Sequence, residues 1–396
     1  MPAPKPYSHC TAQSSIKISV FVFLLILLAP VAGLSDEGES LDVQIGQMLM
    51  VGFRGLSATE ESPIIGDIKR RHIGGVILFD YDVPSKSSVR NIRSPEQVKC
   101  LIVKLQKAAS IPLFVAIDQE GGRVNRLKEK FGFPPTVSEQ YLGTTDNVET
   151  TKKYAQSMAV ILGSLGINTN FAPVVDLNTN PENPIIGKLG RSYSDDPAVV
   201  VRHALIVIDA LHERGIASAI KHFPGHGSST GDSHTGFVDV TKTWSTMELT
   251  PFEAIINSGL CDMVMTAHIF NGKLDPRWPA TLSTGIITGI LRDEFHYDGV
   301  VVSDDMQMKA ISAHYGLETA IERAIMAGCD MLIFANNSVF EEDIAERATA
   351  TIKKLVRKGA VSADRIGNSY RRIRKLKERI SSLTASVHAK SQKSSD

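Results

Sequence analysis

The chain has 396 residues, a hydrophobic content of 43% and equal numbers of basic and acidic residues, 43 of each. This length allows one large α/β domain or two ordinary ones, with a sizeable core. Because the formal net charge is zero, no global field favours nucleic acid or an anionic membrane surface. A small, uncharged or mixed-charge ligand fits the composition better.

The N-terminus has the layout of a secretory signal. Lys5 and Lys17 precede an apolar run at 18–28, and small residues and then an acidic stretch follow it. The run is shorter than the roughly 20 residues that a membrane-spanning helix needs. We expect residues 1–33 to be a signal peptide and the protein to be exported, periplasmic or extracellular. An uncleaved anchor at 18–28 is the alternative.

Three cysteines remain once the signal peptide and Cys10 are removed: Cys100, Cys261 and Cys329. An odd number at wide spacing does not make a disulfide framework. We expect Cys261 and Cys329 to pack as small core residues.

Apolar runs of strand length alternate with segments of helical periodicity after residue 40. Each run is nearly continuously hydrophobic, as expected of parallel strands that are buried on both faces. The predicted strands are 47–53, 75–79, 113–117, 168–175, 217–222, 263–269, 299–303 and 331–335. The predicted helices are 95–109, 151–165, 197–214, 248–258, 285–295, 318–327, 339–358 and 364–380.

This alternation predicts an α/β fold of the (β/α)8 TIM-barrel type, as a single domain over residues 40–380. A doubly wound open sheet is the alternative, but no G-x-G-x-x-G follows the first strand. The polar segment 381–396 is expected to be a disordered tail.

Ionisable residues follow five of the predicted strands. In a barrel the carboxyl ends of all strands meet at one face, where catalytic residues lie. A polar residue after a strand can also cap the next helix, but capping alone explains five strands poorly. The residues are Asp118 and Glu120, Asp176, Lys221 and His222, His268, and Asp304 and Asp305.

The stretch 221–236 holds three histidines, a lysine and an aspartate among four glycines. These could be ordinary polar residues of a turn-rich loop. An H-x-x-x-H spacing suggests a metal site only in a helix, which Pro224 and Gly225 exclude, so no metal is expected. Asp232 and His234 are two residues apart, so the carboxylate can orient the imidazole for proton transfer.

Several polar groups that converge on an uncharged ligand suit a sugar, whose hydroxyl groups they bind. Four motifs carry a closer resemblance: 118–126 (DQEGGRVNR), 189–193 (LGRSY), 221–234, and 302–306 (VSDDM). With them the chain resembles glycoside hydrolase family 3, and within it the bacterial β-N-acetylhexosaminidases that consist of the barrel domain. The resemblance extends from residue 45 to about residue 380.

The resemblance implies a retaining exo-glycosidase that removes terminal β-linked N-acetylglucosamine without a cofactor. Asp304 would be the nucleophile, with Asp305 as its neighbour and rival, and His234, oriented by Asp232, would be the acid and then the base. After His234 the chain runs Thr235-Gly236-Phe237, so its leaving-group contacts are expected to differ from those of the best-known relatives. The implied sugar-binding residues are Asp118, Arg126, Arg191, Lys221 and His222.

Two other enzymes on the same barrel stay open, a β-glucosidase and a β-N-acetylglucosaminide phosphorylase. A sugar-binding barrel without catalysis is a third reading, and it predicts loss of Asp304, Asp232 or His234, all of which are present. Cell-wall muropeptides and chitin-derived oligosaccharides are the expected natural substrates. No nucleic-acid partner is expected.

Overall fold

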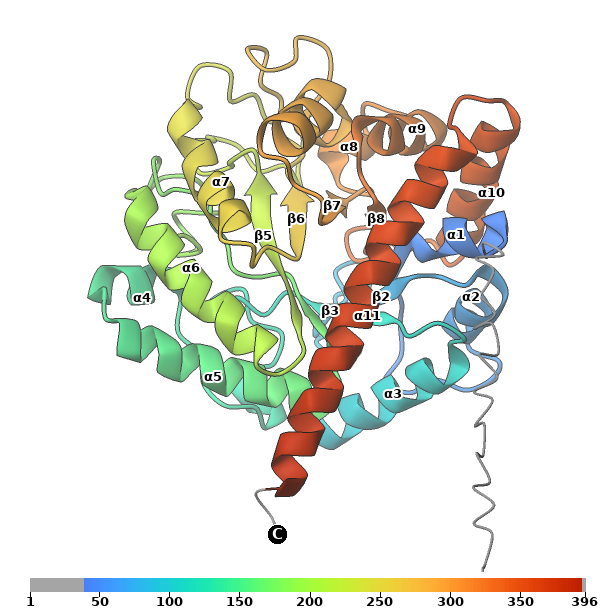
Figure 1. Cartoon of the computed structure of the whole chain (residues 1–396), viewed down its shortest axis with the longest axis horizontal. Helices are drawn as coiled ribbons and strands as arrows, with labels where there is room; N and C mark the ends of the chain where they lie inside the picture. Colours follow the sequence, from blue (N-terminus) through green and yellow to red (C-terminus); the bar gives the residue numbers. More distant parts are fainter. Residues whose placement is uncertain (1–38, 394–396) are drawn as a thin grey trace, which may run out of the picture. The chain divides into compact units, whose positions relative to one another are not determined.

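The computed structural model describes residues 39–393, and the predicted signal segment 1–33 lies outside them. In the unit that begins at Ser40, eight parallel strands close into a barrel in the order β1 to β8, and β8 pairs with β1. Figure 1 shows the helices around this barrel. The predicted (β/α)8 fold is confirmed. The strands are β1 (Leu49–Gly52), β2 (Gly75–Leu78), β3 (Phe114–Ile117), β4 (Thr169–Asn170), β5 (Ala217–Phe223), β6 (Met263–Thr266), β7 (Val300–Asp305) and β8 (Met331–Phe334).

The strands form the centre of the core. Every residue of β1, β2, β3, β6 and β8 is buried, because one face packs inside the barrel and the other packs against helices. This two-sided burial explains why the sequence shows continuous apolar runs rather than an alternation.

Strand β4 is shorter than the predicted strand 168–175. At its end the side chain of Asn170 replaces backbone pairing: its Oδ1 accepts from the amide of Gln119, and its Nδ2 donates to the Gln119 carbonyl. Pro173 then offers no N–H for a ladder. Pairing with β5 resumes only at the bridge between Val174 and Lys221, where the amide of Val175 donates to the carbonyl of Lys221.

Most helices lie where the periodicity predicts them, and several begin at the expected caps. Ser94 accepts from the amide of Gln97, and Asp196 accepts from the amide of Ala198. The α-helices are α1 (Leu41–Gln47), α2 (Pro63–Arg71), α3 (Pro95–Ala108), α4 (Glu139–Thr145), α5 (Val148–Leu165), α6 (Pro197–His212), α7 (Thr250–Asn257), α8 (Lys309–Ser312), α9 (Leu317–Ala327), α10 (Ile344–Arg357) and α11 (Ala363–Lys393). Shorter or wider turns are η1 (Glu129–Phe131), η2 (Thr246–Leu249), η3 (Ala280–Leu282) and the π-helical η4 (Gly285–Glu294).

Helix α2 was not predicted from the sequence, although Pro63 stands at its start and Lys69, Arg70 and Arg71 at its end, as helix chemistry favours.

The expected disordered tail is wrong for residues 381–393, because α11 continues through them. The hydroxyl groups of Ser381 and Thr384 donate to carbonyls one turn earlier, those of Lys377 and Ile380. Ile380 is buried, and Thr384 lies against Gly215. A polar segment thus extends a helix that packing has already started, with no proline or glycine to end it.

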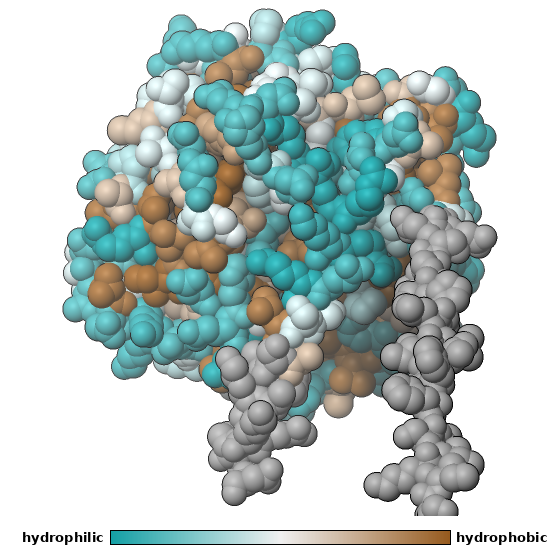
Figure 2. All heavy atoms as spheres, in the orientation of Figure 1, coloured by the Kyte–Doolittle hydropathy of each residue, from teal (hydrophilic) through white to brown (hydrophobic). Residues whose placement is uncertain are grey.

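In Figure 2 hydrophobic residues gather over α5 and α6, whereas the face over α11 is mostly hydrophilic. Within residues 39–393 no helix has both the length and the apolar character that a membrane span requires.

Candidate active site

A cavity of about 190 Å³ lies among residues at and beyond the carboxyl ends of the strands. Seven of the eight predicted site residues line it, and the eighth, Asp232, is hydrogen-bonded to one of them, His234. The structure therefore brings together groups that lie up to 186 residues apart in the sequence (304 − 118). The seven are Asp118, Arg126, Arg191, Lys221, His222, His234 and Asp304.

One side of the cavity is a buried network of charges. Lys221 Nζ lies 2.9 Å from Asp118 Oδ1 and 2.7 Å from Glu120 Oε1. Arg126 Nη2 reaches the other oxygen of Asp118 at 3.4 Å. Burial alone raises the pKa of Asp118, but the charges of Lys221 and Arg126 outweigh it and hold that pKa below its usual range. Both carboxylates are therefore ionised and fixed in place.

Arg191 extends this network on the other side of Glu120. Its Nε and Nη2 each lie 2.7 Å from one oxygen of Glu120, which makes a bidentate pair. Burial raises the pKa of Glu120, yet Arg191 and Lys221 lower it further, to about 2.

His222 is held between a donor and an acceptor. Its Nδ1 lies 2.6 Å from Asp176 Oδ2, and its Nε2 lies 3.2 Å from Arg191 Nη2. Because Asp176 only accepts and Arg191 only donates, the proton of His222 sits on Nδ1. Asp176 also accepts from the backbone amides of His222 and His226. We call Asp118, Glu120, Asp176, Arg191, Lys221 and His222 the buried wall.

His226 belongs to the loop rather than to a cation site. Its Nδ1 lies 2.9 Å from Ser229 Oγ and its Nε2 lies 3.4 Å from Ser233 Oγ. Burial is the main cause that lowers its pKa, to about 4.

Asp304 and Asp305 end β7 with different surroundings. Asp304 accepts from the amide of Asp305 at 2.7 Å and is otherwise free to face the cavity. Asp305 Oδ1 accepts from the amides of Gln307 and Ala335, so it ties β7 to the end of β8. Burial raises the pKa of both, but three imidazoles nearby hold the pKa of Asp304 below its usual range, whereas that of Asp305 rises to about 6.

His234 and Asp232 form the exposed part of the site. His234 Nδ1 lies 2.8 Å from Asp232 Oδ1, which also accepts from the His234 amide. The His234 side chain is 53% exposed and the Asp232 side chain 29%. Partial burial lowers the pKa of His234, but the bond to Asp232 and the charge of Asp304 raise it more, so the net shift is upward. The imidazole can therefore hold a proton next to an ionised carboxylate.

Three further residues of the site had no assigned role in the sequence analysis, although each stands at a strand end. Glu120 and Asp176 belong to the buried wall. His268 is buried, with its Nε2 3.0 Å from the carbonyl of Asp305 and its Nδ1 2.8 Å from Thr281 Oγ1. Glu120 follows Asp118 by two residues, and this spacing indicates in the sequence that the two side chains lie on the same side of the chain.

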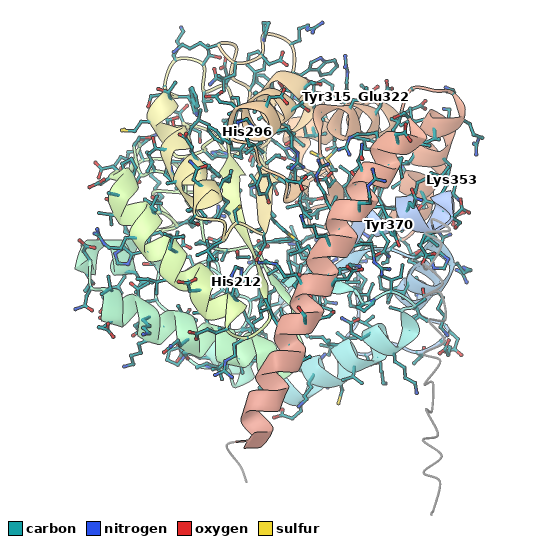
Figure 3. All side chains as sticks on the ribbon, viewed as in Figure 1. His212, His296, Tyr315, Glu322, Lys353 and Tyr370 are labelled. Carbon is teal, nitrogen blue, oxygen red and sulfur yellow. The ribbon has the colours of Figure 1, made fainter. Side chains whose placement is uncertain are left out.

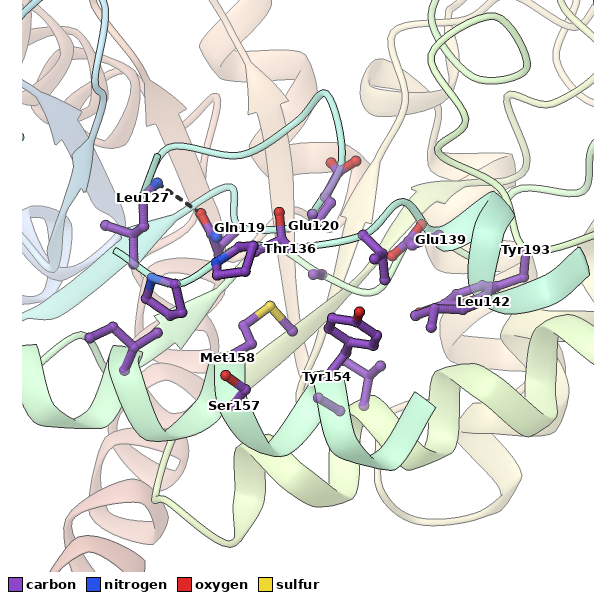
Figure 4. A pocket seen from close by; sticks show the side chains of 18 residues that line it. Gln119, Glu120, Leu127, Thr136, Glu139, Leu142, Tyr154, Ser157, Met158 and Tyr193 are labelled. Atoms are coloured by element: carbon purple, nitrogen blue, oxygen red, sulfur yellow. Dashed lines mark hydrogen bonds between the residues drawn. The ribbon is translucent and has the colours of Figure 1, made fainter. Parts of the chain in front are cut away.

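A second, smaller cavity lies behind Glu120, between the 119–142 segment and α5 (Figure 4). Most of its lining is apolar, as with Leu142 and Met158. Glu139 is buried here, and its Oε1 accepts from the amide of Val174. Burial and the charge of Glu120 raise its pKa well above the usual range, so this carboxyl is neutral. This cavity lies behind the buried wall, and Glu120 is the ionised group among the residues that line it.

The carboxyl end of the barrel presents an ionised carboxylate, a proton-carrying imidazole and several polar groups around one cavity. This is the arrangement expected of the class of barrels that process carbohydrates. The comparisons agree with this class. Residues 40–376 match the glycosyl hydrolase family 3 N-terminal domain, and the chain belongs to this family.

Named relatives support the same placement. Beta-hexosaminidase A of Pseudoalteromonas piscicida is 34% identical over 388 residues, which cover 87% of this chain and 62% of that protein. The structure of a family 3 beta-N-acetylglucosaminidase from a Paenibacillus species has a TM-score of 0.79 and 36% identity, over 87% of this chain and 63% of that one. The beta-N-acetylhexosaminidase of Beutenbergia cavernae has a TM-score of 0.77 and 28% identity, over 86% of this chain and 99% of that one. The chain thus spans less than two thirds of the first two proteins.

Proposed function

We propose that the chain is a retaining exo-glycosidase that removes terminal, non-reducing β-linked N-acetylglucosamine. One observation carries the proposal: an ionised Asp304 and a proton-holding His234 share a cavity whose remaining polar groups suit sugar hydroxyls. The names of the relatives, beta-hexosaminidase and beta-N-acetylglucosaminidase, support the choice of sugar.

In the first step Asp304 attacks the anomeric carbon, and the bond from that carbon to the leaving-group oxygen breaks. His234 gives its Nε2 proton to that oxygen while Asp232 keeps the imidazole oriented through Nδ1. The neutral His234 then takes a proton from water, whose oxygen attacks the glycosyl–Asp304 ester. The sugar leaves with its β configuration, and both side chains return to their starting states.

The buried wall, together with Arg126, would bind the terminal sugar. Asp118 is an acceptor for two hydroxyl groups, and Arg126, Arg191 and Lys221 are donors. Since their mutual ion pairs already fix these groups, little ordering is left to occur on binding.

The test is hydrolysis of a chromogenic β-N-acetylglucosaminide by residues 34–396, with Asp304→Ala and His234→Ala and the matching β-glucoside. Cleavage of the acetamido substrate alone, lost in Asp304→Ala, is the expected result. Cleavage of the glucoside alone would contradict the choice of sugar. A sugar phosphate as the product in phosphate buffer would show a phosphorylase instead.

We also propose that the protein is exported and acts on cell-wall muropeptides or chitin-derived oligosaccharides. The signal-like segment 1–33 supports export. Cell fractionation with N-terminal sequencing tests it: a processed chain outside the cytoplasm is expected, and a full-length chain in the cytoplasm would contradict it.

A further inference from the structure

Three loops at the catalytic face bring aromatic rings into contact. Phe237, after β5, lies with its ring centroid 5.4 Å from that of Phe270, after β6, and 5.6 Å from that of His314, after β7. His314 neighbours Tyr315, whose ring lies 5.5 Å from Trp278. We call these five residues the aromatic strip. In Figure 3 Tyr315 lies toward the end of the view where the β5 and β6 arrows of Figure 1 point.

Phe237 is the exposed ring of this strip that is nearest in sequence to the acid/base pair. It is 48% exposed, although it follows His234 by only three residues. Its backbone surroundings are fixed, because the amide of Phe270 donates to Val238 and the amide of Val240 donates to Phe270. Because Phe237 is in contact with two further rings, it is part of an apolar cluster rather than a single scattered residue, and such clusters mark binding surfaces.

The loops that carry the strip adjoin residues that line the cavity. Ser233 and His234 line the cavity, and the amide of Ala310, in α8, donates to the carbonyl of Ser233 at 3.3 Å. That bond joins the loop of His234 to the segment that carries His314. Phe237 and His314, which are in ring contact, therefore stand on two neighbouring segments next to His234.

The chemistry decides which part of a substrate meets the strip. The acid must reach the oxygen of the leaving group, so the leaving group lies on the side of His234. The buried wall comes from the ends of β3, β4 and β5 and holds the terminal sugar. What extends past His234 is the leaving group, and Phe237 follows His234 by three residues on the same loop.

We propose that Phe237, backed by Phe270 and His314, is the surface on which the first sugar ring of the leaving group stacks. The inference rests on the proposed function and adds the residue that selects the leaving group. Phe237 offers no hydrogen-bond donor, acceptor or charge, so it selects by contact with an apolar face. A β-linked sugar presents a face of C–H groups, which the negative face of an aromatic ring attracts.

The experiment compares two substrates that share the terminal sugar. N,N′-diacetylchitobiose carries a sugar as its leaving group, and β-N-acetylglucosaminyl fluoride carries an atom too small to stack. Phe237→Ala is expected to lower kcat/KM for the disaccharide about 3- to 10-fold, as loss of one aromatic contact implies. For the fluoride the change stays below about twofold. Phe237→Trp restores disaccharide cleavage because it restores the ring.

Val339→Ala is the matched control. Val339 is also an exposed apolar residue, 50% exposed, and it follows Ser338 of the cavity lining after β8. It is expected to leave the ratio of the two substrates unchanged.

Three results would overturn the inference while the proposed function stands. Equal losses on both substrates in Phe237→Ala would show that the ring only supports the loop. Unchanged disaccharide cleavage in Phe237→Ala would show that no sugar stacks there. An unaltered protein that cleaves the fluoride but not the disaccharide would show the same. An unaltered protein that cleaves neither substrate would refute the proposed function itself.

Discussion

The two halves of the site are built in opposite ways. In the buried wall each ionic group contacts an opposite charge or a hydrogen-bond partner. Lys221, for example, pairs with both Asp118 and Glu120. The acid/base pair stands on a loop and rests on one side-chain contact, with the His234 side chain half exposed.

This difference fits the role proposed for each half. Groups that recognise a fixed sugar gain from being held in advance, since ordering them on binding would cost affinity. A group that exchanges protons with water and faces a departing product needs access to solvent. We therefore expect changes in the wall to affect stability and changes in the pair to affect kinetics.

The largest effect is expected from Lys221→Met. The substitution removes the cation that pairs with the carboxylates of Asp118 and Glu120 in the protein interior. The loss of these ion pairs costs about 3–5 kcal/mol of unfolding free energy. Denaturant titration measures the loss. Lys69→Met is the control, because Lys69 pairs with Glu60 at the surface, and its change should stay below about 1 kcal/mol. Equal effects of the two variants would break the comparison.

His234→Ala should leave stability nearly unchanged and lower kcat on the disaccharide about 10²- to 10⁴-fold, the usual range for a lost general acid. The fluoride needs no proton for departure, so its first step should be spared. Burst kinetics with the fluoride separates the two steps. A loss of thermal stability as large as that of Lys221→Met would contradict an exposed, independent pair.

The two aspartates of β7 are expected to differ in the same way, with Asp305 affecting stability and Asp304 affecting catalysis. Asp305→Ala removes the acceptor of the Gln307 and Ala335 amides and should cost about 1–3 kcal/mol. Asp305→Asn keeps an acceptor oxygen and should largely restore stability and retain activity. Asp304→Asn should instead fold normally and lose activity. Thermal melts and rates for the three variants check this, and an active Asp304→Asn would contradict the assignment of the nucleophile.

The smallest change is expected in the pH profile of Asp232→Asn. Asp232 raises the pKa of His234, and the protonated imidazole is the acid, so kcat/KM for the disaccharide falls as the pH rises through that pKa. Without the carboxylate charge this alkaline limb moves to lower pH. The acid limb stays in place, since the low pKa of Asp304 does not depend mainly on Asp232. Rates between about pH 5 and 8 measure the alkaline limb, and rates at lower pH measure the acid limb. An unmoved alkaline limb would count against the pair.

Much of this arrangement could be predicted from the sequence. Parallel strands buried on both sides appear as continuous apolar runs, and the polar residues that follow them therefore share one face. Strand position alone does not separate Asp304 from Asp305, because both follow the same predicted strand, and it was the family resemblance that selected Asp304. The structure adds a physical difference, the two backbone amides that Asp305 binds.

Contacts between distant segments account for what was missed. Glu120 gains its place from Arg191, 71 residues away, and Asp176 gains its place from two amides of the β5 loop. The polarity of 381–393 predicts disorder, yet the helix persists because Ile380 and the contact with Gly215 hold the preceding turns. These contacts join residues that are far apart in the sequence, so the local composition around each residue does not predict them.

The acid/base pair has a further consequence for engineering and for evolution. Asp232 and His234 bind each other within three consecutive residues, and the Asp232 carboxylate also fixes the His234 backbone. The acid/base pair thus lies on one short segment of the loop after β5, and a single loop graft would exchange it together with Phe237. Under the proposed function, such a graft would change the leaving-group contacts and leave the buried wall intact.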